Sequence, residues 1–140
     1  MTRAPIVLTT GQELESREIG PITQTDIVRF AGAGGDFNPL HHDAGYARRA
    51  GLPDVIAMGQ MQAGMLAAWV TDLVHVENLV TYSVRFASPL AIGDRLVLTG
   101  RVDDVDPTDH IAALTLEAKV GDRVVISGKA RVRTASESAA

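Results

Sequence analysis

The chain has 140 residues, a formal net charge of −4 and no cysteine. This length fits one domain of ordinary size, which can bury a core without cross-links. The lack of cysteine excludes disulfides, thiolate nucleophiles and cysteine-ligated metal sites. The negative charge, together with an aromatic content of 4%, argues against nucleic-acid binding, which relies on clustered basic and stacking side chains.

Nothing in the sequence predicts membrane insertion. Residues 1–10 are too polar for a signal peptide, and no apolar run reaches the roughly 18 residues that a membrane span needs. The most apolar stretch, residues 58–76, contains polar or small interruptions, which are Gln60, Gln62, Gly64, Thr71, Asp72 and His75. We therefore expect a cytoplasmic protein in which this stretch is a buried helix.

The sequence of the first third of the chain predicts short secondary-structure elements. Residues 5–20 look extended, with a short strand at 15–19. Thr23 or Thr25 then stands at an N-cap position. The helix that follows has apolar residues at helical spacing and ends in glycines: Ile27, Val28, Phe30, Ala31, Gly32, Gly34 and Gly35. A further turn or two of helix is expected over 43–50, where Gly51 and Pro53 stop it.

The rest of the chain predicts one long helix followed by β structure. Residues 59–73 have almost no polar face, so this helix should be buried. From residue 79 on the pattern is that of β structure, with alternation that predicts strands near 82–86, 96–102, 111–116 and 124–132, joined as an antiparallel meander. A helix this apolar must be covered by the sheet. We expect one α+β domain over 1–134, in which a curved antiparallel sheet wraps a central helix, and a disordered tail over 135–140.

The sheet should also have edge strands, which invite pairing with another chain. The simplest arrangement that removes such an edge is a dimer whose two sheets join into one. We therefore expect an oligomer.

The most informative segment is residues 35–43, because it places two carboxylates, one amide and two imidazoles in a loop of fixed course. Each residue has an ordinary structural interpretation, since Asp caps helices and Asn-Pro starts turns. Capping does not require His41, however, so the set as a whole indicates proton-transfer chemistry.

This loop resembles the signature of the MaoC-like, or hydratase-2, family. The matching residues are Gly35, Asp36, Asn38, Pro39, Leu40, His41 and Ala47, and the spacing to the long helix also fits. Ala33 departs slightly from the family pattern. The resemblance implies the hot-dog fold, usually dimeric, and an (R)-specific enoyl hydratase or 3-hydroxyacyl dehydratase. It implies Asp36 and His41 as the catalytic pair, acting without a cofactor on thioesters of coenzyme A or acyl carrier protein.

The chemistry of hydration is consistent with this pair. Adding water to an α,β-unsaturated thioester needs a base for the water and an acid for Cα, and histidine titrates near neutrality. The thioester oxygen gains charge and needs a preorganised donor. Gly59 stands where the long helix should begin, so we assign its N–H to the oxyanion hole, although it could simply cap or pack.

Substrate binding is predicted for Asn38, Met58 and Met61. Met58 stands where the family usually has a histidine, and this change could reshape the acyl pocket. Met61 belongs to an apolar helix face that could equally be core. The run His42-Asp43 does not predict a metal site, because adjacent residues rarely present both side chains to one ion.

Three matters stay open at this level. A thioesterase of the same fold is disfavoured, because the helix start offers no carboxylate. A heterodimer in which this chain is the catalytic subunit stays open beside a homodimer, and so does a non-catalytic protein that only binds acyl thioesters. Two basic groups could meet the phosphates of coenzyme A or an acidic carrier protein, or could be ordinary solvated residues: Arg48 with Arg49, and Lys129 with Arg131 and Arg133.

Overall fold

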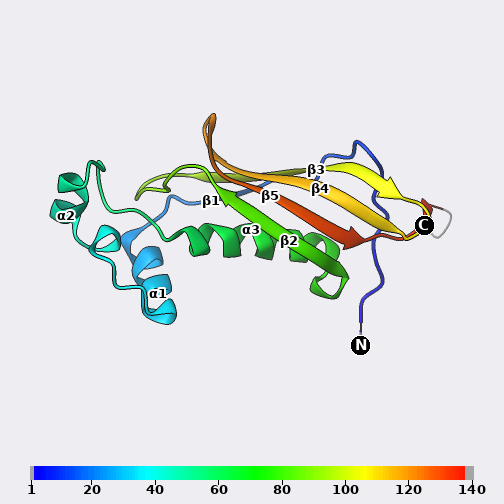
Figure 1. Ribbon diagram of the computed structural model, residues 1–140, viewed down its shortest axis with the longest axis horizontal. Helices are drawn as coiled ribbons and strands as arrows, with labels where there is room; N and C mark the ends of the chain where they lie inside the picture. Colours follow the sequence, from blue (N-terminus) through cyan, green and yellow to red (C-terminus); the bar gives the residue numbers. More distant parts are fainter. Residues whose placement is uncertain (1, 138–140) are drawn as a thin grey trace.

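A computed structural model describes residues 2–137 of the chain. It contains one five-stranded antiparallel sheet with a long helix, α3, against one face (Figure 1). The strands are β1 (Arg17–Ile19), β2 (Leu79–Phe86), β3 (Leu96–Asp106), β4 (Ile111–Val120) and β5 (Arg123–Arg133). The helices are α1 (Gln24–Gly34), α2 (Ala44–Arg49) and α3 (Gly59–Val74), with short 3₁₀ turns η1 (Pro39–His41) and η2 (Val76–Asn78). The predicted α+β architecture with a central helix is confirmed.

The core lies between α3 and the inner face of the sheet. Leu66, Trp69 and Val70 of α3 are almost fully buried. Gly100 of β3 allows the tryptophan to pack closely, because a Cβ there would lie 3.2 Å from the Trp69 ring and 3.0 Å from Leu116. The Trp69 indole N–H also donates to the carbonyl of Glu15 (3.0 Å), which satisfies its one polar atom.

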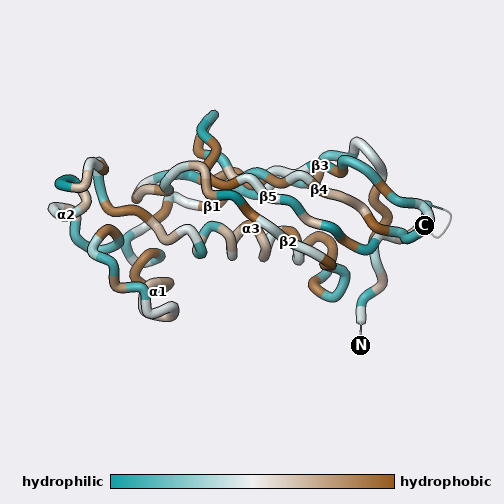
Figure 2. The backbone as a smooth tube through the Cα atoms, in the orientation of Figure 1, coloured by the Kyte–Doolittle hydropathy of each residue, from teal (hydrophilic) through white to brown (hydrophobic). Residues whose placement is uncertain are grey.

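Alternation along the strands decides which residues meet α3. Figure 2 shows apolar and polar positions alternating along the sheet. In β4 the side chains of Ala112, Leu114, Leu116 and Ala118 are buried, and the residues between them are only partly buried. Successive side chains of a strand point to opposite faces, so this period of two places one apolar row on the helix.

The predicted meander is wrong in one respect. The sheet order is β1-β3-β4-β5-β2, so β2 pairs with β5 and not with β3, which follows it in sequence. Crossing from β2 to β3 covers three strand spacings, about 14 Å. Residues 87–95 make this crossing, and within them Leu90 is fully buried and Ala91 bridges to Ile56. A connection anchored through the buried Leu90 replaces the tight turn of a hairpin.

The ends of the two short helices fall where the sequence places them. Thr23, and not Thr25, caps α1, in a capping box with Asp26. Asp43 caps α2 by accepting from the Tyr46 N–H (3.0 Å), and Gly51 follows the helix with a φ of 92°. These caps satisfy backbone groups that have no partner within the helices.

The predicted tail is wrong at its first residue. Ala135 pairs with Val7, and its N–H donates to the carbonyl of Ile6 (2.8 Å). The last part of that prediction, residues 138–140, lies outside the described residues. Within residues 2–137, no helix has the length and apolarity to cross a membrane.

Candidate active site

The loop that carries the polar residues is held by its own side chains. Gly35 ends α1 with a φ of 71°, and the Asp36 N–H donates to the carbonyl of Ala31 (3.0 Å). The Asp36 carboxylate accepts from the Asn38 N–H (3.3 Å), and the Asn38 side chain accepts from the Leu40 N–H (3.0 Å). Asp36 and Asn38 therefore have the structural roles that ordinary turn chemistry assigns to them.

His41 and Asp36 face each other across this loop. Nε2 of His41 lies 3.4 Å from Oδ2 of Asp36, and the side chains are 9% and 47% exposed. Nδ1 of His41 lies 2.8 Å from the carbonyl oxygen of Ile56. A carbonyl can only accept, so Nδ1 carries the proton. In the neutral ring, Nε2 is then an acceptor that faces a carboxylate, and the two acceptors can share one water.

The histidine is tied to the segment that leads into α3. The Ile56 N–H donates to the carbonyl of Leu40 (3.0 Å), and the Ala57 N–H donates to the carbonyl of Leu90 (2.8 Å). Gly59 is the first residue of α3, three positions after Ile56. Its N–H has no acceptor among residues 2–137, as expected in the first turn of a helix.

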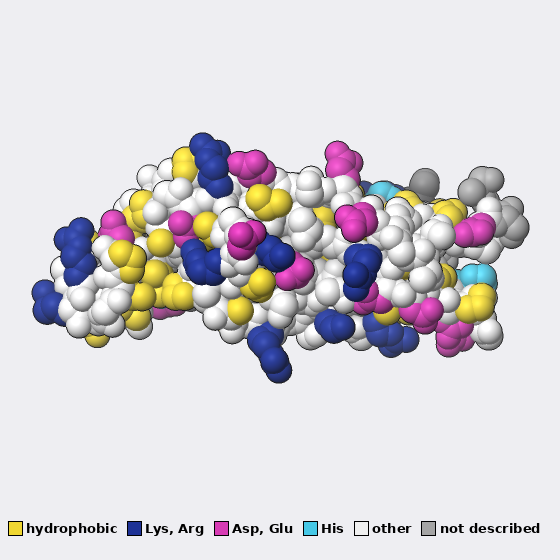
Figure 3. All heavy atoms as spheres, turned by 90° about the horizontal axis from the view of Figure 1, so that it is seen from above, with side chains coloured by type: hydrophobic (Ala, Val, Ile, Leu, Met, Phe, Trp, Pro, Cys, Tyr) yellow, Lys and Arg dark blue, Asp and Glu magenta, His cyan; other side chains and the backbone are white. Residues whose placement is uncertain are grey.

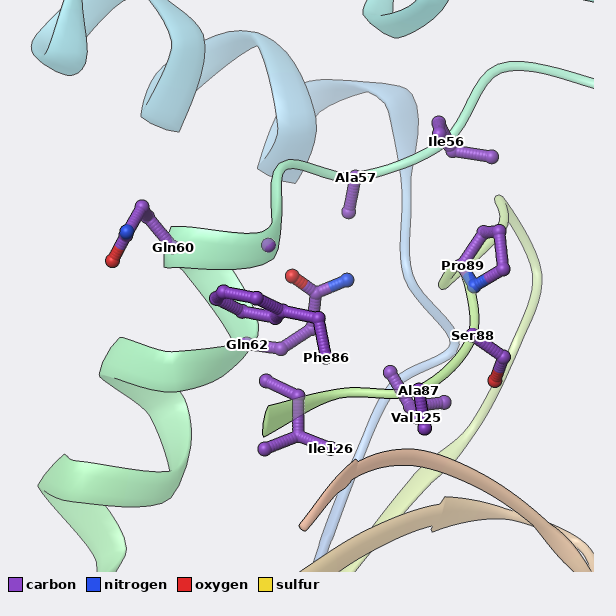
Figure 4. Close-up of a pocket in the computed structure, with 11 residues that line it drawn as sticks. Ile56, Ala57, Gln60, Gln62, Phe86, Ala87, Ser88, Pro89, Val125 and Ile126 are labelled. Carbon is purple, nitrogen blue, oxygen red and sulfur yellow. The ribbon is translucent and has the colours of Figure 1, made fainter. Parts of the chain in front are cut away.

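A pocket of about 530 Å³ opens beside Gly59 (Figure 4). Three parts of the chain form it: the start of α3 with the residues before it, the end of β2 with its continuation, and β5. The lining residues are Ile56, Ala57, Gly59, Gln60, Gln62, Phe86, Ala87, Ser88, Pro89, Val125 and Ile126. The walls are mostly apolar, as is usual for a small-molecule site. Asp36 and His41 are not among the lining residues, and Ile56 links them to this wall.

Gly59 lies in close contact with Phe86. A Cβ built on Gly59 would lie 2.9 Å from the Phe86 ring, which is closer than carbon atoms approach. The pocket residues from β2 and β5 are more than twenty positions from the loop motif. No local pattern marks them as lining residues, and only the strand order brings them to the start of α3.

The other residues assigned to substrate binding lie outside this pocket. Met58 and Met61 are each 4% exposed, and Met58 belongs to the core. Met61 lines a separate groove between α1 and α3, together with Phe30 and Met65. Asn38 caps η1. A substrate-binding role for these three residues stays a prediction.

His42 differs from its neighbour. It is exposed, and its Nε2 lies 3.3 Å from the carbonyl oxygen of Phe37. Among residues 2–137, no three His, Asp or Glu side chains gather in a way that could hold a metal ion.

Comparison with known proteins defines the class. The family described as "MaoC like domain" matches residues 6–124, and the chain belongs to this family. It is 32% identical to the 3-hydroxybutyryl-CoA dehydratase of Methylorubrum extorquens, over 80% of this chain and 73% of that protein. It is 31% identical to the (R)-specific enoyl-CoA hydratase of Rhodospirillum rubrum, over 79% of this chain and 78% of that protein.

Its fold is similar to that of the unliganded R-hydratase PhaJ1 from Pseudomonas aeruginosa. The TM-score is 0.80 at 24% identity, and the match covers 93% of this chain and 84% of that one. The predicted hot-dog fold is thereby confirmed.

Proposed function

We propose that this protein is a hydro-lyase that interconverts trans-2-enoyl and (R)-3-hydroxyacyl thioesters, with Asp36 and His41 as the acid/base pair. The observation that carries the proposal is the orientation of His41. Its Nδ1 donates to the Ile56 carbonyl, which turns the lone pair of Nε2 toward the carboxylate 3.4 Å away. The named relatives support the reaction class.

The geometry suits one shared water. Such a water donates one hydrogen to Nε2 of His41 and the other to Oδ2 of Asp36, and its oxygen lone pairs then face the substrate. As the oxygen bonds to Cβ of the enoyl group, His41 takes a proton and the electron pair moves to the thioester oxygen. The Asp36 carboxylate stabilises the imidazolium. The pair then returns one proton to Cα, so its protonation is restored. Dehydration runs the same steps backward.

The thioester oxygen needs a donor while it carries this charge. The Gly59 N–H is our candidate, because it has no acceptor in the described chain and stands at the N-terminus of a sixteen-residue helix. Gly59 also lines the 530 Å³ pocket, which suits an acyl chain.

Thioester hydrolysis is the second candidate reaction for this fold. The pocket beside Gly59 argues against it, because none of its lining residues is a carboxylate. Glutamines, Gln60 and Gln62, occupy the first turn of α3 at the pocket wall. An amide cannot activate a hydrolytic water as a base.

The two basic groups differ in their surroundings. Figure 3 looks onto the outer face of the sheet, where basic and acidic side chains alternate instead of forming one basic patch. On that face Arg133 donates to the carbonyl of Glu77 (3.0 Å). Arg48 and Arg49 of α2 are exposed and form no ion pair within residues 2–137. We therefore favour this pair for the phosphates of a thioester carrier, coenzyme A or acyl carrier protein.

We also infer that the protein assembles as a dimer through β2. This strand is eight residues long, and within residues 2–137 it pairs with β5 alone, so its other edge has no partner strand in the described part of the chain. Val80 and Phe86, at its two ends, are 40% and 53% exposed. A long apolar edge strand is suited to pairing. A homodimer is the simplest form, and a related hot-dog subunit would fit the same edge. A cytoplasmic location agrees with this function.

The decisive experiment follows the loss of enoyl absorbance with crotonyl-CoA and with longer enoyl-CoA substrates. We expect hydration by the wild type, and Asp36→Asn and His41→Ala should each lower kcat by at least about 10²-fold. His42→Ala is the matched control, because it removes the adjacent exposed imidazole, and it should leave the rate unchanged.

Two results would contradict the proposal. One is an unchanged rate in both Asp36→Asn and His41→Ala. The other is release of free thiol without hydration, which would indicate a thioesterase.

A further inference from the structure

Gln62 is an unusual residue for its place. It lies in the first turns of α3, it is only 2% exposed, and it lines the pocket beside Gly59. Figure 4 shows its side chain among the lining residues, next to the ring of Phe86. Burying an amide in an apolar wall costs free energy unless the amide is hydrogen-bonded. A leucine or methionine would fill this position without that cost.

The partners of the amide determine its orientation. One end of the Gln62 side chain faces the carbonyl oxygens of Met58 and Gly59, which are both acceptors. The two ends of an amide are told apart by their partners and not by their shape. The end that faces the two carbonyls is therefore Nε2, which donates to the Met58 oxygen and to the Gly59 oxygen (3.0 Å).

The hydrogen bond from Gln62 to the Met58 carbonyl is not needed to give that backbone oxygen a partner. The Met58 carbonyl already accepts from the Met61 N–H (3.0 Å), so it does not need Gln62 as a partner. That carbonyl belongs to the same planar peptide unit as the Gly59 N–H. A bond donated to its oxygen restrains the rotation of the whole peptide plane. It also polarises the unit, which strengthens the N–H at the other side as a donor.

We propose that Gln62 is a positioning residue that aims and polarises the Gly59 N–H for the thioester oxygen. This inference rests on the proposed function. Gln62 acts on the reaction through the Met58–Gly59 peptide and does not touch the reacting atoms. Because charge on the thioester oxygen grows in the transition state, the effect should appear in kcat more than in KM.

The chain offers a control in Gln12. It is the same residue type, but it is exposed and lies outside the pocket, where its Oε1 accepts from the Thr9 N–H (3.0 Å). Gln62→Met keeps the length and apolar volume of the side chain and removes the donor. Gln62→Glu places a carboxylate against two carbonyl oxygens.

The first measurement is steady-state hydration. We expect Gln62→Met to lower kcat about tenfold with KM within about twofold, the scale of one lost hydrogen bond in a preorganised site. Gln62→Glu should be slower still, and Gln12→Met should match the wild type. If Gln62→Met retains the wild-type kcat, the inference is wrong.

The second measurement reports the hydrogen bond to the thioester directly. In the Asp36→Asn background the enoyl substrate should persist, so the infrared band of a ¹³C-labelled crotonyl-CoA carbonyl can be recorded on the protein. We expect a lower frequency than in solution, and Asp36→Asn/Gln62→Met should return the band toward the solution value. A role in packing alone would leave the band in place, and that outcome overturns the inference. Gln62→Leu serves as a second variant if the methionine variant does not fold.

Failure of the inference about Gln62 can be distinguished from failure of the proposed function. If Asp36→Asn is inactive while Gln62→Met behaves as wild type, the proposed hydro-lyase function is supported and only the proposed role of Gln62 is wrong. If the wild type hydrates no enoyl thioester of any length, the proposed function fails and the inference fails with it.

Discussion

At the scale of single residues, the loop after α1 uses the same side chains for structure and, in our proposal, for chemistry. Asp36 accepts a backbone N–H through one oxygen and faces His41 through the other. His41 is fixed through Nδ1, so only Nε2 is available for proton transfer. Fixing both groups in the folded state avoids the entropy of ordering them when substrate binds.

Asn38 allows the structural role to be separated from a role in substrate binding. Its side-chain oxygen caps η1 at the Leu40 N–H (3.0 Å). Asn38→Ala should lower the free energy of unfolding by about 1 kcal/mol, the usual value of a cap. Asn38→Asp keeps the accepting oxygen and should unfold like the wild type in urea. If Asn38→Asp is stable but loses hydration activity, the amide N–H₂ has a role with substrate as well.

Gly59 gives a second test at this scale. Gly59→Ala places a methyl group 2.9 Å from the Phe86 ring, and because Phe86 is 53% exposed its ring can swing aside. We expect a modest loss of stability, on the order of 1 kcal/mol, and a larger loss of kcat, because the displaced ring and the methyl group obstruct the pocket. Thermal unfolding and the hydration assay measure the two effects. Wild-type kcat in Gly59→Ala would contradict the placement of the thioester beside this residue.

At the scale of elements, Tyr82 connects β2 to α3. Its hydroxyl donates to the carbonyl of Ala63 (2.7 Å), and burial raises the pKa of Tyr82 to about 12. The unfolded value is near 10, so between pH 10 and 12 the folded state holds a proton that the unfolded state has lost. The contribution of Tyr82 to the free energy of unfolding is therefore complete below pH 10, and it is lost as the pH rises through 12.

Urea unfolding between pH 8 and 11.5 tests this prediction. The free energy of unfolding of the wild type should fall above pH 10. That of Tyr82→Phe should fall less steeply with pH in the same range. Below pH 10, Tyr82→Phe should be less stable by about 1 kcal/mol, because one hydrogen bond is missing. Tyr46→Phe, which removes the hydroxyl of an exposed tyrosine on α2, is the control for the substitution itself. Equal slopes in all three proteins would show that Tyr82 is not the group responsible.

At the scale of the whole molecule, the open edge of β2 predicts the assembly. Val80→Lys/Phe86→Lys places charges at both ends of this edge and should convert a dimer into a monomer, because charged edge strands resist pairing. Light scattering after size exclusion measures the mass. The matched control, Val28→Lys/Val76→Lys, changes two apolar side chains that are 51% and 61% exposed but lie outside the strand. Equal masses for both double variants would place the interface elsewhere.

The sequence by itself determined the local features of this protein. The apolar run predicted α3, alternation predicted the long strands, and Asp36 and His41 stand five positions apart in a motif that can be read directly. These features depend on neighbours within a few residues, where helix period, strand period and turn chemistry act. The family could be predicted for the same reason, since its motif is local.

Only the tertiary structure decided the strand order, the pocket and the partners of the polar groups. The pairing of β2 with β5 joins residues that are 40 to 53 positions apart, and periodicity contains no information about which strand pairs with which. The pocket depends on that pairing, because β2 and β5 bring Phe86 and Ile126 to the start of α3. Gln62 was visible in the sequence as a polar interruption of an apolar helix. Its role could not be predicted, because burial, the wall it lines and the carbonyls it contacts are set by the packed fold.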